Sequence, residues 1–378
     1  MPPSIALIRL ILAGGRLAPR RRLLDAHSGD AAAALEAGIS AWRASGLSEA
    51  QCAALRKPDA GTLSMAASAA AWLDAPAHHL ITWGDVDYPV LLSRIASPPL
   101  ALFVDGEPGH LWHPQVAVVG SRDASPNGRD TAHQFAHALA VAGLAITSGL
   151  AAGIDAAAHA AALDHPGGLT VAVLGCGPDV AYPAAHRELR DRIAARGAVV
   201  SEYLPGTPPL RVHFPARNRL IAGLAAGMLV VEAAERSGAL ISARIAAESG
   251  REVFAVPGSI HHPLARGCHA LIRDGAALAT HPDDIIASLA PALADTASAL
   301  RNRLDGALPA LPDTPTEMPD DPYGLWKAMG HDPTSMEQLV DRTGLTVARL
   351  SPILLTLELE GRVSVQHGRY TRKSPVLR

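Results

Sequence analysis

The spacing of the hydrophobic residues divides this chain into parts of different kinds. From residue 5 to residue 73 the apolar positions recur every three or four residues, as in Ile5–Leu12 and Leu63–Leu73, which is the spacing of amphipathic helices. Between residues 79 and 288 the apolar positions instead form short continuous runs. Such runs predict strands buried on both faces, and therefore a parallel sheet covered by helices.

The predicted sheet begins with two strands, at Leu80–Trp83 and Leu100–Val104. Seven further strands alternate with alanine-rich helices through right-handed connections, and glycine-rich loops follow the strands. Ligands bind such sheets at the carboxyl ends of the strands. The seven strands are expected at residues 116–119, 144–147, 170–174, 198–201, 228–231, 252–256 and 277–280, and the helices at 130–142, 154–163, 186–195, 239–249 and 270–274.

The C-terminal part has a different pattern. Residues 289–322 contain six prolines and scattered acids, which predict a linker. Residues 323–378 predict a separate unit, with helices from Ser335 to Arg342 and over about 347–360. Strands at 361–365 and 369–371 complete a winged-helix pattern.

The fold class is therefore α/β: an extended Rossmann-like parallel sheet core at residues 79–288, with an N-terminal helical domain at 1–78 and a C-terminal winged-helix domain.

Composition limits the partners and the compartment. Hydrophobic residues make up 48% of the 378 and the net charge is −3, so a polyanion must bind a local basic patch. Cys52, Cys176 and Cys268 form no CxxC pair or disulfide framework, which favours the cytoplasm. No apolar run approaches the roughly 20 residues of a membrane span, so no membrane partner is expected.

The sharpest chemical signal is Gly120-Ser121-Arg122, directly after the strand at 116–119. A backbone N–H, a hydroxyl and a guanidinium at a strand-to-helix turn are suited to binding phosphate. The turn matches neither the Walker loop nor the GxGxxG dinucleotide fingerprint. It therefore predicts anion binding, with an ordinary tight turn as the plainer alternative.

The next loop, Ser148 to His159, allows two interpretations. Gly149 lies before a helix start whose N–H groups suit an anion. An enzymatic interpretation makes Ser148 a nucleophile, with Asp155 and His159 as base and orienter. The favoured interpretation is structural, a pair of side chains at i, i+4 that locks the loop, because no GxSxG elbow surrounds Ser148.

The later loops add cations and an aromatic ring. Arg211, Arg217 and Arg219 lie within nine positions without an intervening acid, and Phe214 lies among them. Cations with an interleaved aromatic ring are suited to binding single-stranded nucleic acid. A solvated surface is the plainer alternative. Tyr182 is expected to stack on a base, and Cys176 is expected to be an inert filler. The candidate binding residues in these later loops are Arg187, Arg211, Phe214, Arg217, Asn218, Arg219, Ser237 and Gly238.

No catalytic group, metal or cofactor is expected. His261, His262 and His269 are spaced too irregularly for a metal site, and no cysteine or carboxylate completes one.

Taken together, these loops resemble those of the DNA-processing protein A family. The resemblance spans roughly residues 80–288. It rests on the motifs at 118–122, 148–159, 214–224, 231–240 and 251–258. The flanking parts are similar to that family's sterile-alpha-motif-like and winged-helix domains.

The resemblance implies a protein that is not an enzyme. It binds single-stranded DNA, forms a homodimer and helps to load the RecA recombinase onto incoming strands during natural transformation. By position, the family's DNA pocket corresponds to Gly120–Arg122, the region of Arg187, and Arg217–Arg219. The chain departs from the family at His186, where Asn is usual.

Two alternatives remain at this point. One is a nucleotide-processing hydrolase similar to the phosphoribohydrolases, although Pro257-Gly258-Ser259-Ile260 replaces their Pro-Gly-Gly-x-Gly-Thr run and the following Glu is missing. The other is a pure interaction scaffold. For the winged unit, a partner-binding role is favoured over duplex binding, because its second helix carries Arg349 together with Glu358 and Glu360.

Overall fold

The computed structural model describes residues 2–307, 325–329, 334–346, 350, 353–354, 357, 363–366 and 369–372. Its chain forms two compact units, Met1–Asp305 and Gly306–Arg378. The first unit contains both the helical bundle and the large sheet, so the expected boundary at residue 78 lies within it.

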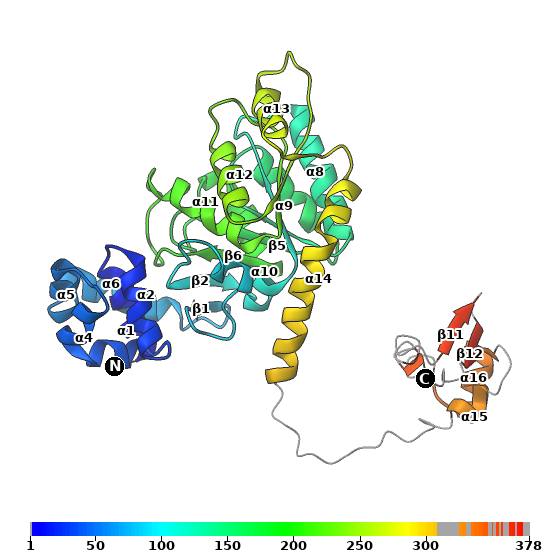
Figure 1. Ribbon diagram of the computed structural model, residues 1–378, viewed down its shortest axis with the longest axis horizontal. Coiled ribbons are helices and arrows are strands. Elements are labelled where there is room, and N and C mark those ends of the chain that lie inside the picture. The colour runs from blue at the N-terminus through cyan, green and yellow to red at the C-terminus, as the bar shows by residue number, and fades with distance from the viewer. Residues whose placement is uncertain are drawn as a thin grey trace. The chain divides into compact units, whose positions relative to one another are not determined.

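The N-terminal part of the first unit is helical, as predicted (Figure 1). Leu7, Leu24 and Trp42 share one buried core with Leu100 and Ala101, which lie at the start of the second strand. The bundle is therefore packed directly onto the sheet region. Its helices are α1 (Pro3–Leu12), α2 (Leu17–Ala26), α3 (Ala31–Glu36), α4 (Gly38–Ala44), α5 (Glu49–Arg56) and α6 (Ala60–Trp72).

A nine-stranded sheet forms the centre, in the order β1-β2-β6-β5-β4-β3-β7-β8-β9. β1 and β2 pair antiparallel, β2 joins β6 antiparallel, and the remaining seven strands are parallel. All nine predicted strands of this sheet are confirmed. They are β1 (His78–Thr82), β2 (Ala101–Gly106), β3 (Gln115–Val119), β4 (Ala145–Ser148), β5 (Thr170–Val173), β6 (Ala198–Ser201), β7 (Gly227–Val230), β8 (Glu252–Ala255) and β9 (Ala277–Leu278).

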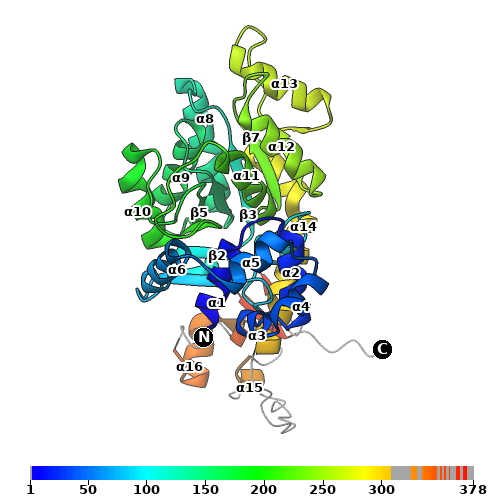
Figure 2. The same cartoon turned by 90° about the vertical axis from the view of Figure 1, so that its left-hand side faces the viewer.

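Helices cover both faces of the sheet, which is why its strands are continuously apolar. The side chains of α11 and α12 share one core with alternate strand residues such as Ala117 and Met228. Those of α8, α9 and α14 share another with Val118 and Leu229; Figure 2 shows α8 and α9 on one side and α12 on the other. The helices are α7 (Val90–Ser93), α8 (Pro126–Val141), α9 (Ile154–Asp164), α10 (Arg187–Arg196), α11 (His213–Leu224), α12 (Gly238–Glu248), α13 (Arg266–Arg273) and α14 (Pro282–Ala307).

The strand order reverses between β3 and β7. The chain moves outward from β3 through β4 and β5 to β6, and then returns to place β7 on the other side of β3. Loops that leave these two strands diverge, and in parallel sheets this divergence opens a crevice at the carboxyl ends. The Gly-Ser-Arg turn that follows β3 lies at this reversal, where a ligand site is expected.

Two helices correct the sequence-based account. The basic segment at residues 213–224, expected to be a loop, is helix α11, because Leu220, Ile221 and Leu224 form a buried apolar face. Helix α14 continues to Ala307 and so occupies the first part of the predicted linker at 289–322. Its Leu289 is buried against the sheet. The rest of that linker, residues 308–322, lies outside the described residues.

The second unit contains a three-stranded antiparallel sheet in the order β10-β12-β11. Ser335 caps the predicted first helix through a reciprocal capping box with Gln338. Of the predicted second helix at 347–360, residues 350, 353, 354 and 357 are described and helical; its remainder, and residues 361–362 of the hairpin, lie outside the described residues. The elements are α15 (Leu325–Met329), β10 (Thr334–Ser335), α16 (Met336–Thr343), β11 (Val363–Gln366) and β12 (Arg369–Arg372).

Within the described part of the chain, no helix combines the length and apolarity that a membrane span requires.

Candidate functional site

A pocket of about 450 Å³ lies at the strand-order reversal between β3 and β7. Its walls come from the loops after β3 and β7, from the N-terminal parts of α9 and α12, and from the middle of α11. Seven predicted site residues meet there, although they span more than a hundred positions of the sequence. They are Gly120, Ser121, Arg122, Arg217, Asn218, Ser237 and Gly238.

The Gly-Ser-Arg turn is held mainly by its own backbone. The Ser121 N–H donates to the Glu232 carbonyl at 2.7 Å, and the Ile154 N–H donates to the Ser121 carbonyl at 3.2 Å. A Cβ on Gly120 would lie 2.6 Å from Ile154 Cγ1, so glycine is needed there for packing. The Ser121 N–H, expected to bind phosphate, is thus committed to Glu232, and the exposed side chain of Arg122 is the group that reaches solvent.

Arg217 is buried, with only 4% of its surface exposed. Its guanidinium donates to the Gly149 carbonyl at 2.9 Å and to the Val173 carbonyl. The Asp155 carboxylate accepts from the Gly149 N–H at 3.1 Å. Burial lowers the pKa of Arg217 to about 10, opposed by the nearby Asp155 charge, so the side chain remains a cation at neutral pH. Arg217 and Gly149 therefore hold the loops together; direct DNA contact by either stays a prediction.

Arg219 also has a partner within the protein. Its guanidinium donates to the Glu202 carboxylate, and both side chains are largely buried. Glu202 directly follows β6, so this ion pair fixes the second turn of α11 to the sheet edge. The uninterrupted basic run of the sequence is consequently neutralised in part by an acid from another strand.

An exposed cation lies beside a pair of aromatic rings. The Arg122 guanidinium carbon lies 5.8 Å from the centroid of the Phe214 ring, and that ring is 5.2 Å from the ring of Tyr182. Tyr182 is 44% exposed. Two other candidate residues, Arg187 and Arg211, are exposed as well. Neither of them lines the pocket.

The opposite wall is the start of α12. Ser237 Oγ accepts from the Ala239 N–H at 3.1 Å and caps the helix. Arg236, exposed and lining the pocket, was missed by the sequence analysis because a single arginine beside Glu235 gives no distinctive pattern.

The enzymatic interpretation of the second loop finds no support. Ser148 is buried and donates to the Val118 carbonyl at 2.6 Å. Asp155 and His159 were expected to pair, but they bond to different partners, His159 to Thr170 Oγ1 at 2.7 Å. Burial raises the pKa of Cys176 to about 11, as an inert thiol requires. Among the described residues, no group of three metal-ligating side chains is found.

His186, the departure from the family pattern, contacts the same loop. Its Nδ1 lies 3.0 Å from the Leu150 carbonyl, and Leu150 is a buried residue with a positive φ of 57°. The imidazole therefore supports the β4–α9 loop. The side-chain amide of Asn, which is usual at this position, can donate the same kind of hydrogen bond.

Comparisons with known proteins identify the family that this chain resembles. Residues 79–290 match the family model for DNA recombination-mediator protein A, and residues 309–369 match the DprA winged helix domain. Protein Smf of Escherichia coli is 42% identical over 306 residues, covering 81% of this chain and 80% of that protein. DNA processing protein DprA of Streptococcus pneumoniae is 51% identical over 200 residues, covering 53% and 70%.

Two solved structures are also similar. DNA processing protein A of Streptococcus pneumoniae matches with a TM-score of 0.63 and 39% identity, over 74% of this chain and 95% of that one. DNA processing protein A of Helicobacter pylori, whose structure concerns its single-stranded DNA binding mode, matches with a TM-score of 0.51 and 28% identity, over 56% and 96%.

The buried His159 makes stability depend on pH. Burial lowers its pKa from 6.5 to about 3, so its contribution is complete above pH 6.5 and is lost as the pH falls towards 3. Wild type should lose about 1.4 kcal/mol of unfolding free energy per pH unit below 6.5 relative to His159→Gln. Denaturant titrations of both proteins over a pH series measure this difference. The carboxylates are the same in both proteins, so their contribution to the pH dependence drops out of the comparison. Parallel pH profiles would contradict a buried neutral imidazole.

Proposed function

Since the chain belongs to the DNA recombination-mediator protein A family, we propose that it binds single-stranded DNA at the carboxyl edge of its sheet, without a catalytic step. The observation that carries this proposal is the exposed Arg122 guanidinium beside the Phe214 and Tyr182 rings at the strand-order reversal. A cation and an aromatic surface are the two groups that single strands require. The single-stranded DNA binding mode of the Helicobacter pylori relative supports the same assignment.

The candidate residues divide into two groups with different proposed roles. Exposed Arg122, Arg187 and Arg211 contact phosphates, together with the Ser121 hydroxyl and the Ser237–Gly238 helix start. Phe214 and Tyr182 stack on bases. The remaining candidates, Gly120, Gly149, Arg217, Asn218 and Arg219, shape the pocket and hold its walls. Because phosphate contacts carry no sequence information, little base specificity is expected.

The family relationship motivates finer proposals. We infer that the protein helps to load RecA recombinase onto the bound strand during natural transformation, that it acts as a homodimer and that it works in the cytoplasm. Light scattering with and without an oligonucleotide tests the dimer. Incubation with nucleoside monophosphates tests the alternative of a phosphoribohydrolase-like enzyme, for which release of free base is the decisive result.

Replacing Arg122 by Ala should weaken binding of a single-stranded oligonucleotide by about tenfold, because a charge-assisted contact to phosphate is lost. The slope of log affinity against log salt should fall by about one. Arg56→Ala is the matched control, since Arg56 is an exposed arginine at the end of α5 in the helical bundle and does not line the pocket. Fluorescence anisotropy over a salt series measures both quantities, and an unchanged slope for the Arg122 variant would exclude the phosphate contact.

Replacing Tyr182 by Leu should have a different signature. Leucine keeps an apolar contact with Phe214 but removes the aromatic face, so affinity should fall by about tenfold through lost stacking. The salt slope should stay as in wild type, because no phosphate contact changes. Equal affinity for wild type and variant in the same anisotropy assay would place the bases elsewhere.

A further inference from the structure

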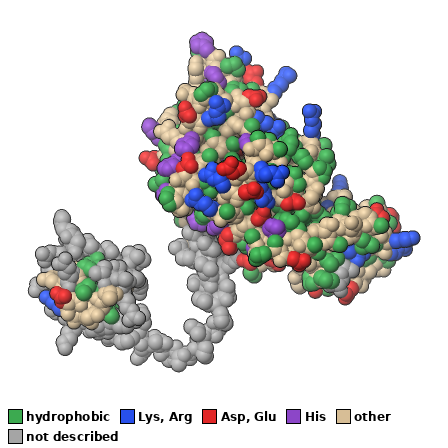
Figure 3. Space-filling view, turned by 180° about the vertical axis from the view of Figure 1, so that it is seen from behind, with side chains coloured by type: hydrophobic (Ala, Val, Ile, Leu, Met, Phe, Trp, Pro, Cys, Tyr) green, Lys and Arg blue, Asp and Glu red, His purple; other side chains and the backbone are tan. Residues whose placement is uncertain are grey.

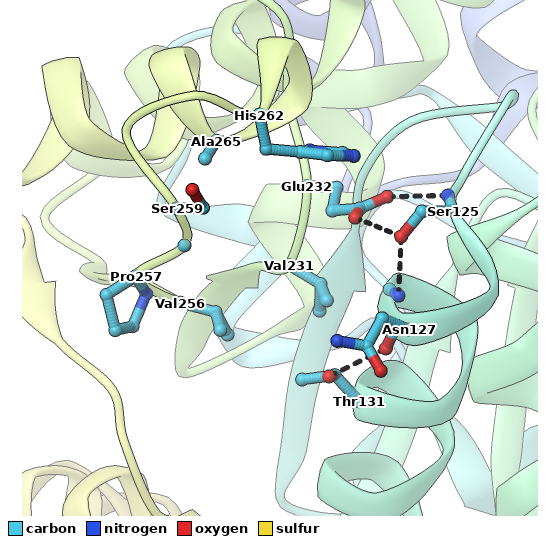
Figure 4. Close-up of a pocket in the computed structure, with 12 residues that line it drawn as sticks. Ser125, Asn127, Thr131, Val231, Glu232, Val256, Pro257, Ser259, His262 and Ala265 are labelled. Carbon is cyan, nitrogen blue, oxygen red and sulfur yellow. Dashed lines mark hydrogen bonds between the residues drawn. The ribbon is translucent and has the colours of Figure 1, made fainter.

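Glu232, in the loop that follows β7, holds the loop that carries Arg122 at both ends. Its backbone carbonyl accepts from the Ser121 N–H at 2.7 Å. Its carboxylate accepts from the Ser125 N–H at 2.9 Å and from the Ser125 hydroxyl at 2.6 Å (Figure 4). Arg122 lies between these two attachment points. One acidic residue from another strand thus fixes both the start and the end of the loop.

Two glycines make room for this arrangement. A Cβ on Gly128 would overlap the Glu232 carboxyl, whose atoms are its three nearest neighbours. A Cβ on Gly120 would lie 2.9 Å from the Glu232 carbonyl oxygen. Gly128 has no unusual backbone conformation that would itself require glycine. Glycine at position 128 is therefore explained by the space that the Glu232 side chain occupies.

The sign of the Glu232 charge argues for a role other than ligand contact. A carboxylate beside a site for a polyanion repels the ligand, so on electrostatic grounds its removal should strengthen DNA binding. Both carboxylate oxygens are instead directed to Ser125, whose hydroxyl also accepts from the Gly128 N–H and caps α8 at 2.9 Å. The carboxylate thus joins β7 to the first turn of α8.

We propose that Glu232 is a positioning residue for DNA binding: by holding Ser121 and Ser125, it sets the place of the Arg122 guanidinium over Phe214. This inference rests on the proposed function, because it acts through the Arg122 contact with a phosphate. Glu232 would thus contribute to DNA binding without touching DNA, although its own charge opposes binding.

The test compares Glu232→Ala with Glu232→Gln. Glutamine can accept from the Ser125 N–H and donate to the Ser125 hydroxyl, so it removes the charge and keeps the attachment to Ser125. Alanine removes the charge and the attachment to Ser125, and leaves the backbone bond from the Ser121 N–H in place. Glu232→Ala should bind a single-stranded oligonucleotide about tenfold more weakly, with a salt slope lower by about one, like Arg122→Ala. Glu232→Gln should bind within about twofold of wild type. Glu235→Ala, which removes an exposed carboxylate three residues away, should not weaken binding.

A double variant separates positioning from general destabilisation. In an Arg122→Ala background, Glu232→Ala should cause no further loss, since the only contact it controls is already gone. Additive losses would overturn the proposal, as would Glu232→Ala binding like wild type or Glu232→Gln binding as weakly as Glu232→Ala. If Glu232→Ala yields no folded protein by circular dichroism, Gly128→Ala replaces it: its methyl group displaces the carboxylate with the charge intact, and the same loss is expected.

The outcomes also separate this inference from the proposed function. If wild type binds no single-stranded DNA, or Arg122→Ala binds equally well, the function itself fails. If Arg122→Ala weakens binding and Glu232→Ala does not, only the positioning role fails.

Discussion

The buried guanidinium of Arg217 is the interaction on which the rest of the site depends. From α11 it donates to the carbonyls at Gly149 and Val173, which follow β4 and end β5, and it lies near the Asp155 charge. Burying a cation costs several kcal/mol of desolvation free energy unless such hydrogen bonds and an opposite charge offset it. The same bonds join α11 to the loop after β4 and to the end of β5 before any ligand arrives, which lowers the entropic cost of binding.

This arrangement divides the charged residues into those that hold the site and those that face the solvent. Arg217 is near Asp155 and Arg219 pairs with Glu202, so their charges are balanced inside the protein. Arg122, Arg187, Arg211 and Arg236 remain exposed. In a chain with a net charge of −3, and with basic and acidic side chains interspersed on the face in Figure 3, these few cations provide a local rather than a global attraction for a polyanion.

Sequence reasoning succeeded where one residue pattern has one physical cause. Short, β-branched apolar runs bounded by glycine, such as Val116–Val119, favour buried parallel strands, and the loops that follow such strands meet at one sheet edge. The same reasoning failed where a residue's role depends on its distant neighbours. Arginine at 217 and at 219 looks solvent-facing in sequence, because Asp155 and Glu202 are far away along the chain. Pro291 suggested a linker, although Ile285 and Leu289 already carried the helical spacing of α14.

Binding of single-stranded DNA at the strand-order reversal of the large sheet is open to a direct experiment. Amide hydrogen exchange with and without a short single-stranded oligonucleotide tests it most directly, because it reports every part of the chain in one experiment. The account predicts slower exchange at residues 120–125 and 236–240, with no change in helices α1 to α6. Protection confined to residues 325–372, in the winged unit, would contradict it.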